Sequence, residues 1–358
     1  MDREASVAVA PVGAVRRLAV VADDLTGAAD AAAPFALRGL TVSVALTDAL
    51  PDAEVVALST DNRGRPAAEA AARTREAVGR VRDAELLFVK IDSTLRGQVR
   101  ADVEGALAAW GATTAVATPA FPAQGRVVRE GALHVHGEPT VPHVAALFPD
   151  GVEVVDAGRH EDLVALARRI AGDRRVAIGS GGLSRALAEI LQSAPDSPPA
   201  EQQYGATARS VLVVVGTPHP VTRAQIAPIG AVPVTSADAA VDALRSGKRA
   251  VLTCEPDGPV EPESLAAAAL AAGLASAAVA VLDAVPGTGL VLTGGTTALA
   301  VATALGATEL RLYGEVVAGL PLGELVAGPR RVPVVTKSGG FGAPDALDRA
   351  AEALEVCP

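Results

Sequence analysis

The feature that most constrains the fold of this chain is an alternation of short apolar runs with amphipathic stretches, repeated almost from end to end. Residues 16–23, 53–60 and 84–91 have the composition of buried strands, and residues 65–82 have the period of an amphipathic helix. Strands that are apolar along their whole length are typical of parallel sheets covered by helices. The sequence therefore predicts an α/β fold with mainly parallel sheets.

Two stretches interrupt this alternation. Residues 193–209 are rich in Pro, Ser and Gln and lack apolar periodicity, which predicts a linker. We expect it to join an N-terminal domain (18–192) to a C-terminal domain (210–358), with residues 1–17 as a disordered or loosely packed tail. The glycines and alternating pattern of residues 125–140 predict a hairpin excursion. The cleft between two such domains is the expected active site.

Charge and composition exclude several kinds of partner. The net charge of −10 argues against nucleic acid or an anionic membrane surface. The Ala-rich segment 264–285 comes nearest to a membrane span, but alanine is weakly apolar and acidic residues flank the segment. The acidic N-terminus is wrong for a signal peptide, and Cys254 and Cys357 form no metal or disulfide spacing. We therefore expect a cytoplasmic protein that binds small molecules; a homodimer stays open.

Charged loops follow the predicted strands of the N-terminal domain. They are DDLTG from Asp23, TDNRGR from Thr60 and KIDSTLRG from Lys90. Ligands bind beyond the carboxyl ends of parallel strands, where acids can orient a hydroxyl and Lys or Arg can hold a carboxylate or phosphate. A helix N-cap explains one of the two acids at positions 23 and 24, but not both. Which of the two acids caps the helix and which contacts a substrate hydroxyl stays open. We assign Asp24 to the substrate because it lies deeper in the turn.

The C-terminal domain has glycine-rich loops instead: VVVGTPHPVT, VLTGGTTALA and VVTKSGGFGAP. Glycines let backbone N–H groups wrap an anion, and the helix that follows favours negative charge. Together the three loops predict a nucleotide phosphate site. There is no GxxxxGK[ST] motif, and the GSGGLSRA segment from Gly179 does not keep the dinucleotide spacing. His134, His136 and His143 lie at spacings that could suit a metal, but the first two fall in the predicted hairpin with no nearby Cys or acidic cluster. We therefore expect surface or loop histidines rather than a metal site.

The motifs ADDLTGAADA, KIDSTLRG, PAFPAQGR, TGGTTALA and KSGGFG occur in this order. With them the chain resembles the four-carbon acid sugar kinases, a group once labelled a domain of unknown function. The resemblance runs from about Leu18 to Gly342. It implies a kinase that uses ATP and Mg²⁺ to phosphorylate the terminal hydroxyl of erythronate, threonate or a 3-oxo-tetronate. It also implies that the N-terminal domain holds the acid and the C-terminal domain holds ATP.

The resemblance and the loop pattern together give the candidate site. The substrate residues are Asp23, Asp24, Arg63, Lys90, Ile91, Asp92, Ser93 and Arg96. Of these, Asp24 and Asp92 are the candidates to orient and deprotonate the attacking hydroxyl. The ATP-binding residues are Thr217, Gly294, Gly295, Thr296, Thr297, Lys337, Gly339 and Gly340. The metal ligands are unknown.

The chain also departs from the family pattern. It reads GTPH where members often have a Ser-rich loop, and Thr296 stands where an acidic residue is frequent. These departures support one alternative, a non-catalytic sugar-acid or nucleotide-binding protein on the same fold. A nicotinamide-dependent oxidoreductase is a third interpretation, and it rests on the GSGG segment alone. Consumption of ATP that depends on an added four-carbon acid separates the kinase from both.

Overall fold

The fold is taken from a computed structural model, which describes residues 13–15, 17–173, 176–193, 207–254, 260–261 and 264–355. Most of the predicted tail and linker therefore lies outside the described residues. One short strand within the predicted tail and one that ends where the predicted linker begins are described. They are β1 (Gly13–Val15) and β12 (Leu191–Ser193), and they pair in parallel.

The N-terminal half is built on a parallel sheet whose strands are almost fully buried, apart from the edge strand β10. In spatial order the strands are β10 (Val152–Val154), β6 (Ala115–Thr118), β11 (Val176–Gly179), β5 (Leu86–Lys90), β2 (Leu18–Ala22), β4 (Val55–Ser59) and β3 (Val42–Ala45). Its helices are α1 (Leu25–Ala36), α2 (Ala67–Arg80), α3 (Val99–Trp110), α4 (His160–Asp173) and α5 (Gly181–Ile190). Helix α2 packs against α3, while α5 packs against both α1 and α4.

The C-terminal half contains a second parallel group with an antiparallel extension. The parallel strands are β19 (Arg330–Lys337), β16 (Thr288–Thr293), β13 (Ser210–Val215), β15 (Arg249–Thr253) and β14 (Pro233–Val234). The extension is β17 (Glu309–Glu315) and β18 (Pro321–Ala327). Its helices are α6 (Pro220–Ala224), α7 (Ala237–Ser246), α8 (Leu265–Ala284), α9 (Gly295–Ala304) and α10 (Ala346–Glu355). The mainly parallel α/β class is thus confirmed, whereas strand β18 was not expected.

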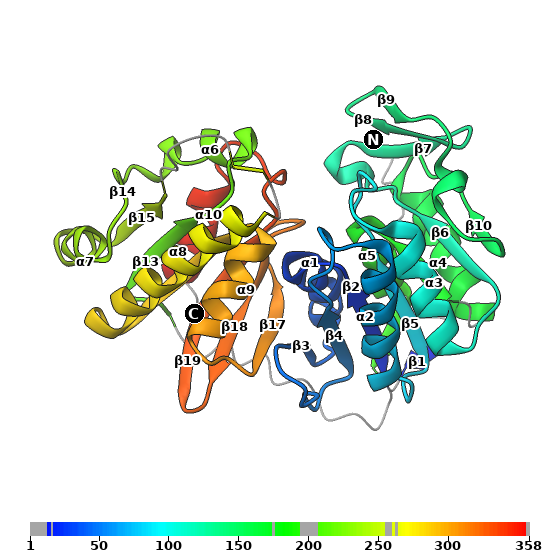
Figure 1. The fold of residues 1–358 in the computed structure, drawn as a ribbon, viewed down its shortest axis with the longest axis horizontal. Coiled ribbons are helices and arrows are strands. Elements are labelled where there is room, and N and C mark those ends of the chain that lie inside the picture. Colours follow the sequence, from blue (N-terminus) through cyan, green and yellow to red (C-terminus); the bar gives the residue numbers. More distant parts are fainter. Residues whose placement is uncertain are drawn as a thin grey trace, which may run out of the picture.

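The two halves meet edge to edge. Strand β3 pairs antiparallel with β17, which joins both groups into one 14-stranded sheet within the described chain. The Ser43 hydroxyl donates across this junction to Glu309 Oε2 at 2.6 Å. Helix α1 lies between the halves (Figure 1), is buried along its whole length and contacts both β17 and α9. The junction holds the carboxyl edges of the two parallel groups close to each other.

The excursion predicted at residues 125–140 is a three-stranded antiparallel sheet of β7 (Arg126–Arg129), β8 (Ala132–Val135) and β9 (Glu138–Val141). This small sheet lies at the top of the N-terminal half in the view of Figure 1. Single 3₁₀ turns occur at Pro122–Gln124, Val144–Leu147 and Ala227–Ile229. The histidines at positions 134 and 136 lie in or beside β8, and no group of three metal-ligating side chains forms among the described residues.

Helix α8 is long and apolar enough to cross a membrane by length and composition. In the structure it packs against α7 and α9 and contacts strands β13 and β15. Its buried side chains include Leu274, Ala278 and Val281. A single helix of this kind is weak evidence for a membrane span, and 33% of its most apolar window is buried in the structure.

Candidate active site

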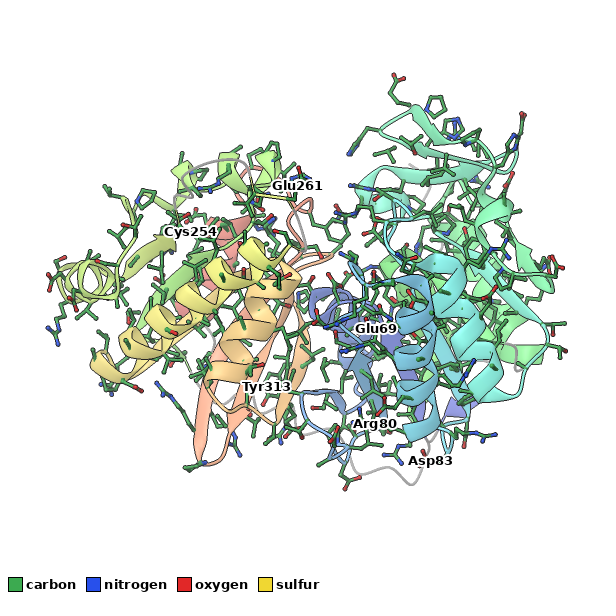
Figure 2. All side chains as sticks on the ribbon, in the orientation of Figure 1. Glu69, Arg80, Asp83, Cys254, Glu261 and Tyr313 are labelled. Carbon is green, nitrogen blue, oxygen red and sulfur yellow. The ribbon has the colours of Figure 1, made fainter. Side chains whose placement is uncertain are left out.

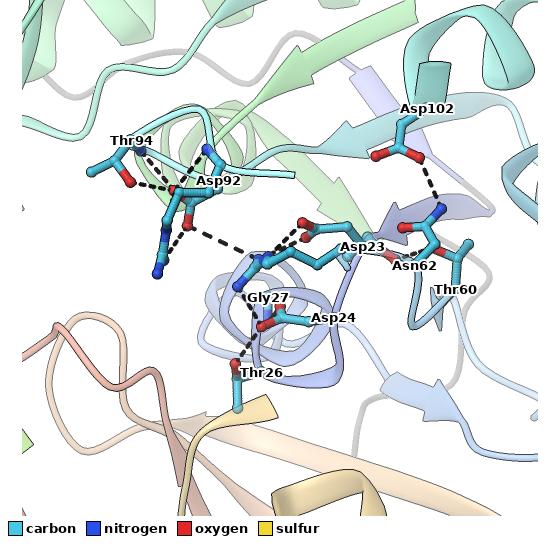
Figure 3. Close-up of polar contacts among 12 residues, drawn as sticks. Asp23, Asp24, Thr26, Gly27, Thr60, Asn62, Asp92, Thr94 and Asp102 are labelled. Atoms are coloured by element: carbon cyan, nitrogen blue, oxygen red, sulfur yellow. Dashed lines mark hydrogen bonds and ion pairs between the residues drawn. The ribbon is translucent and has the colours of Figure 1, made fainter. Parts of the chain in front are cut away.

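The charged loops of the N-terminal half meet because their strands are neighbours. Strand β2 lies between β4 and β5, and Ala22 pairs with Ser59 on one side and with Lys90 on the other. The loops that follow these three strands therefore leave the sheet side by side. Figure 3 labels three carboxylates that gather here, those of Asp23, Asp24 and Asp92. The guanidinium of Arg63 lies among them.

The guanidinium of Arg63 holds both neighbouring aspartates. It donates from Nε and Nη2 to the two oxygens of Asp23 at 2.7 and 2.8 Å, and its Nη1 lies 3.0 Å from Asp24 Oδ2. Its Nη2 also lies 4.0 Å from Asp92 Oδ1. All four side chains are largely shielded from water, which strengthens these charge-assisted contacts.

The two adjacent aspartates have different contacts. Both carboxylate oxygens of Asp23 accept hydrogen bonds from Arg63. Asp24 is the N-cap of α1: its Oδ1 accepts from Gly27 N at 2.7 Å, and its Oδ2 accepts from Thr26 Oγ1 at 3.1 Å. A Cβ atom at Gly295 would lie only 2.8 Å from Asp24 Oδ2, so the carboxylate reaches the first turn of α9 in the other half. Asp24 therefore both caps its helix and faces the cleft.

Their acidities differ as well. Burial raises the pKa of Asp23; Arg63 opposes this effect, and the negative charge of Asp24 adds to it. Burial also acts to raise the pKa of Asp24, but the charges of Arg63 and Lys90 and the Gly27 N–H outweigh it and leave that pKa below its ordinary value. Asp24 is thus the stronger acid of the pair and stands ionised at the cleft.

The third aspartate is committed to an arginine of its own loop. Asp92 accepts from Arg96 Nε at 3.0 Å and Nη2 at 2.6 Å, and from Thr94 N at 3.0 Å. Burial acts to raise the pKa of Asp92, but the hydrogen bonds from Arg96 and the charge of Arg63 hold it well below its ordinary value. Both oxygens of Asp92 are thus engaged, and its carboxylate holds Arg96 in place.

These loops enclose a cavity of about 210 Å³. Lys90 points into it from the end of β5, is only 7% exposed and makes no hydrogen bond or ion pair to any described residue. Arg126 stands over the ring of Phe341, 5.6 Å from its centroid, and lines the cavity too. The predicted substrate residues that line it are Asp24, Arg63, Lys90, Asp92, Ser93 and Arg96. Asp23 and Ile91 do not line it. Asp23 is bound to Arg63, and Ile91 is buried with its N–H bonded to Gly179 O at 2.9 Å.

A second cavity of about 520 Å³ adjoins the first. It is lined by the three glycine-rich loops and, across from them, by residues of the N-terminal half that include Asp61 and Glu69. Glu69 lies on the side of α2 that faces the C-terminal half (Figure 2). The predicted ATP residues that line this cavity are Thr217, Gly294, Gly295, Thr296, Thr297, Gly339 and Gly340. Its volume suits a nucleotide, whereas the smaller cavity suits a molecule of a few carbon atoms.

Close packing explains one glycine that lines this cavity, and backbone conformation explains another. A Cβ atom at Gly216 would lie 1.9 Å from Thr297 Oγ1, so only glycine lets two of the loops approach. Gly294 has φ +89°, a backbone conformation that glycine adopts without strain, and the next residue begins α9. The N-terminus of α9 therefore opens into the cavity, where it favours an anion.

Lys337 does not line either cavity. Its side chain is fully buried, and its Nζ donates to Phe341 O at 2.9 Å, to Thr222 Oγ1 at 3.0 Å and to Ser338 O at 3.0 Å. Burial lowers the pKa of Lys337 to about 7, while the surrounding oxygens favour its charged form. This ammonium holds the KSGGFG loop in shape, and no direct contact to a phosphate follows from its position.

The sequence did not identify one residue between the cavities. His219 lines both, and its Nδ1 accepts from Val221 N at 3.2 Å at the start of α6. In the neutral ring the proton is then on Nε2. Burial and the charges of Lys337, Arg96 and Arg126 lower the pKa of His219. The only signal in the sequence was its place within the GTPHPVT loop.

Two family models match the chain. The model described as a sugar-binding N-terminal domain matches residues 18–147, and the one described as a nucleotide-binding C-terminal domain matches residues 234–347. The first range contains the smaller cavity's predicted residues. The second contains the GGTT and KSGGFG loops, but it begins after the GTPHPVT loop.

The chain is similar to curated kinases over nearly its full length. A D-threonate kinase of Bordetella bronchiseptica is 36% identical, and the match covers 94% of this chain and 97% of the relative. A 3-oxo-tetronate kinase of Methylobacterium radiotolerans is 30% identical (94% and 99% covered), and a D-erythronate kinase of Heliobacterium modesticaldum is 27% identical (91% and 94%).

Among solved structures, a protein of Salmonella typhimurium is 20% identical, with a TM-score of 0.72 over 96% of this chain and 100% of that one. A protein of Haemophilus influenzae is also 20% identical, with a TM-score of 0.64 over 94% and 100%. At this identity the two structures show that the fold is shared.

Proposed function

The chain belongs to the family of four-carbon acid sugar kinases, and we propose that it transfers the γ-phosphoryl group of ATP to the terminal hydroxyl of a four-carbon sugar acid. It is a phosphotransferase with an alcohol acceptor. The observation that carries the proposal is the meeting of two cavities of different chemistry. Asp24, Arg63, Arg96 and His219 line both, so a ligand in one cavity touches a ligand in the other at these residues.

The smaller cavity supplies what an acid sugar needs. Lys90, Arg96 and Arg126 bring positive charge to it and can hold the carboxylate of the substrate. The chain of the acid then runs toward Asp24, which places the terminal hydroxyl at the boundary with the larger cavity. Because Asp24 is ionised and faces that boundary, its carboxylate accepts a hydrogen bond from this hydroxyl and orients its oxygen.

The larger cavity supplies the phosphate contacts. Backbone N–H groups of the glycine-rich loops and the N-terminus of α9 face the β- and γ-phosphates of ATP. The hydroxyl oxygen forms a bond to the γ-phosphorus as the bond to the bridging oxygen breaks, ADP leaves, and Asp24 receives the proton. Phosphoryl transfer of this kind depends mainly on positioning and charge neutralisation.

The residues present also fit Mg²⁺. In kinases this ion is held by one or two carboxylates together with substrate phosphates, and Asp61 lines the larger cavity. The carboxylate of Asp61 would hold it, and the bound ion would neutralise phosphate charge. A cytoplasmic location, where ATP is plentiful, is part of the proposal.

The test is ADP release by the wild-type chain with ATP, Mg²⁺ and a panel of D- and L-threonate, D- and L-erythronate and 3-oxo-tetronates. We expect release that depends on one or a few of these acids, with a phosphorylated acid as the second product. If the chain binds ATP but no acid in the panel stimulates ADP release, the non-catalytic alternative replaces the kinase.

A further inference from the structure

One acidic side chain near the smaller cavity lacks a partner. Asp30 lies in the middle of α1, a helix otherwise made of small and apolar residues apart from its first turn, and it is 2% exposed. Neither of its carboxylate oxygens accepts a hydrogen bond from any residue that the structure describes. Leaving a buried carboxylate unpaired is unfavourable, so its position calls for an explanation.

The surroundings of Asp30 leave room for a ligand and not for a protein partner. Asp30 lines the 210 Å³ cavity together with Lys90. A Cβ atom at Gly181 would lie 2.5 Å from Asp30 Oδ2, so the glycine at the start of α5 keeps this oxygen clear of any side chain. Ser180, the nearby hydroxyl that lines the cavity, already donates to Ala120 O at 2.8 Å.

A purely structural role explains Asp30 less well. The cation on the neighbouring helix, Arg185, forms its ion pair with Glu315 of β17 at 2.7 Å. Burial raises the pKa of Asp30, and the charges of Lys90 and Arg185 only oppose that effect. A carboxylate kept for stability would be expected to form direct contacts, as Asp102 does with Asn62 and Thr74.

We propose that Asp30 is a substrate-binding residue that accepts a hydrogen bond from a secondary hydroxyl of the sugar acid and so selects the configuration of that hydroxyl. The proposal rests on the proposed function, because it concerns the same cavity. Asp30 lies six positions after Asp24, about 9 Å along a helix axis. We therefore assign the terminal hydroxyl to Asp24 and a different, secondary hydroxyl to Asp30.

The chemistry of a carboxylate sets the orientation of the substrate. It accepts hydrogen bonds and repels another carboxylate, so Asp30 favours a hydroxyl and turns the acid group of the substrate toward Arg96 and Arg126. A stereoisomer whose secondary hydroxyl points away would leave Asp30 buried and unpaired. The expected discrimination against it, or against an analogue that lacks the hydroxyl, is about 10- to 100-fold in kcat/KM.

The test is a cycle that changes the enzyme and the substrate in turn. Wild type and Asp30→Asn are assayed with the preferred acid and with its 2-deoxy and 3-deoxy analogues. We expect one deoxy analogue to be about 10- to 100-fold poorer for wild type. For Asp30→Asn, kcat/KM with the preferred acid should be lower than that of wild type by a similar factor. With the same deoxy analogue, kcat/KM of Asp30→Asn should be little lower than that of wild type. If the loss in kcat/KM from the substitution and the loss from removing the hydroxyl multiply for both analogues, Asp30 does not contact a secondary hydroxyl and the proposal fails.

A thermal measurement without ATP gives an independent readout. Asp30→Leu removes the unpaired carboxylate, so we expect the ligand-free variant to melt at or above the wild-type temperature, while the acid no longer raises its Tm. Asp102→Leu is the matched control, because that buried acid has partners, and it should melt lower. A lower Tm for ligand-free Asp30→Leu with retained stabilisation by the acid would overturn the proposal. If wild type phosphorylates no four-carbon acid, the proposed function fails. If wild type is active but the losses from the substitution and from the missing hydroxyl multiply, only the inference about Asp30 fails.

Discussion

Replacing Arg63 by methionine tests how the site is held together. The substitution keeps most of the side-chain volume but removes the guanidinium that contacts Asp23 at 2.7 and 2.8 Å and Asp24 at 3.0 Å. Both carboxylates would remain buried without their main counter-ion. The arginine itself is only 16% exposed, so solvent screens these contacts little.

The expected loss in unfolding free energy is about 3–5 kcal/mol, the usual result of removing one partner from a buried ion pair. Two carboxylates lose the same partner, which favours the upper part of that range. A domain is typically stable by about 5–15 kcal/mol, so the variant should fold but with little margin. Arg63→Lys keeps one charge and loses the bidentate geometry, so an intermediate loss is expected.

The loss should also depend on pH. In the wild type the pKa values of Asp24 and Asp92 lie below their ordinary values, so their ionised forms add stability above about pH 4 that is lost only as pH falls through the folded values. Without Arg63, burial raises the pKa of Asp23 further, and it also raises the pKa of Asp24 from its lowered wild-type value. The variant then loses stability as pH rises through those raised values, and the gap to wild type should widen from pH 5 to pH 8.

Urea unfolding of wild type, Arg63→Met and Arg63→Lys at pH 5 and pH 8 measures this gap. Arg65→Met is the control: it lies two residues away, is 39% exposed and pairs with Glu69, so a loss below about 1 kcal/mol is expected. A loss for Arg63→Met that is as small as the control, or that is equal at both pH values, would refute the account of the carboxylate cluster.

Three further predictions concern single residues. Asp24→Asn should lower kcat by ~10²-fold or more while calorimetry shows unchanged ATP binding; near-full turnover would remove Asp24 as the proton acceptor. Lys337→Met should lower the unfolding free energy by about 3 kcal/mol, because it strands buried loop oxygens; weaker ATP binding at unchanged stability would instead show contact with phosphate. Burial, with the charge of Asp23, raises the pKa of Asp102 to about 7. Wild-type stability should therefore fall as pH rises through 7, and Asp102→Asn should flatten that fall in thermal melts at pH 5.5 and 8.5; parallel curves would contradict it.

The sequence by itself determined the class of the fold and the chemistry of each loop. Apolar runs such as residues 84–91 can be buried only as strands between helices, and such strands pair in parallel. Because ligands meet parallel sheets at their carboxyl edge, the loop after each strand could be assigned a chemistry from its composition alone. The loops after β2, β4 and β5 are charged, and those after β13, β16 and β19 are rich in glycine. This difference predicted a sugar-acid site in the first domain and a phosphate site in the second.

Only the tertiary structure decided which edges pair and where side chains in the loops point. The pairing of β3 with β17 joins strands more than 260 residues apart, a contact that no local period encodes. Lys337 ends a strand beside a glycine loop, as a phosphate ligand could, yet its ammonium turns inward to loop oxygens. Asp24 both caps α1 and faces α9, and Asp30 is left without a partner in an otherwise apolar helix. Local pattern fixes period and composition, whereas the direction of a side chain depends on atoms that long-range packing brings near.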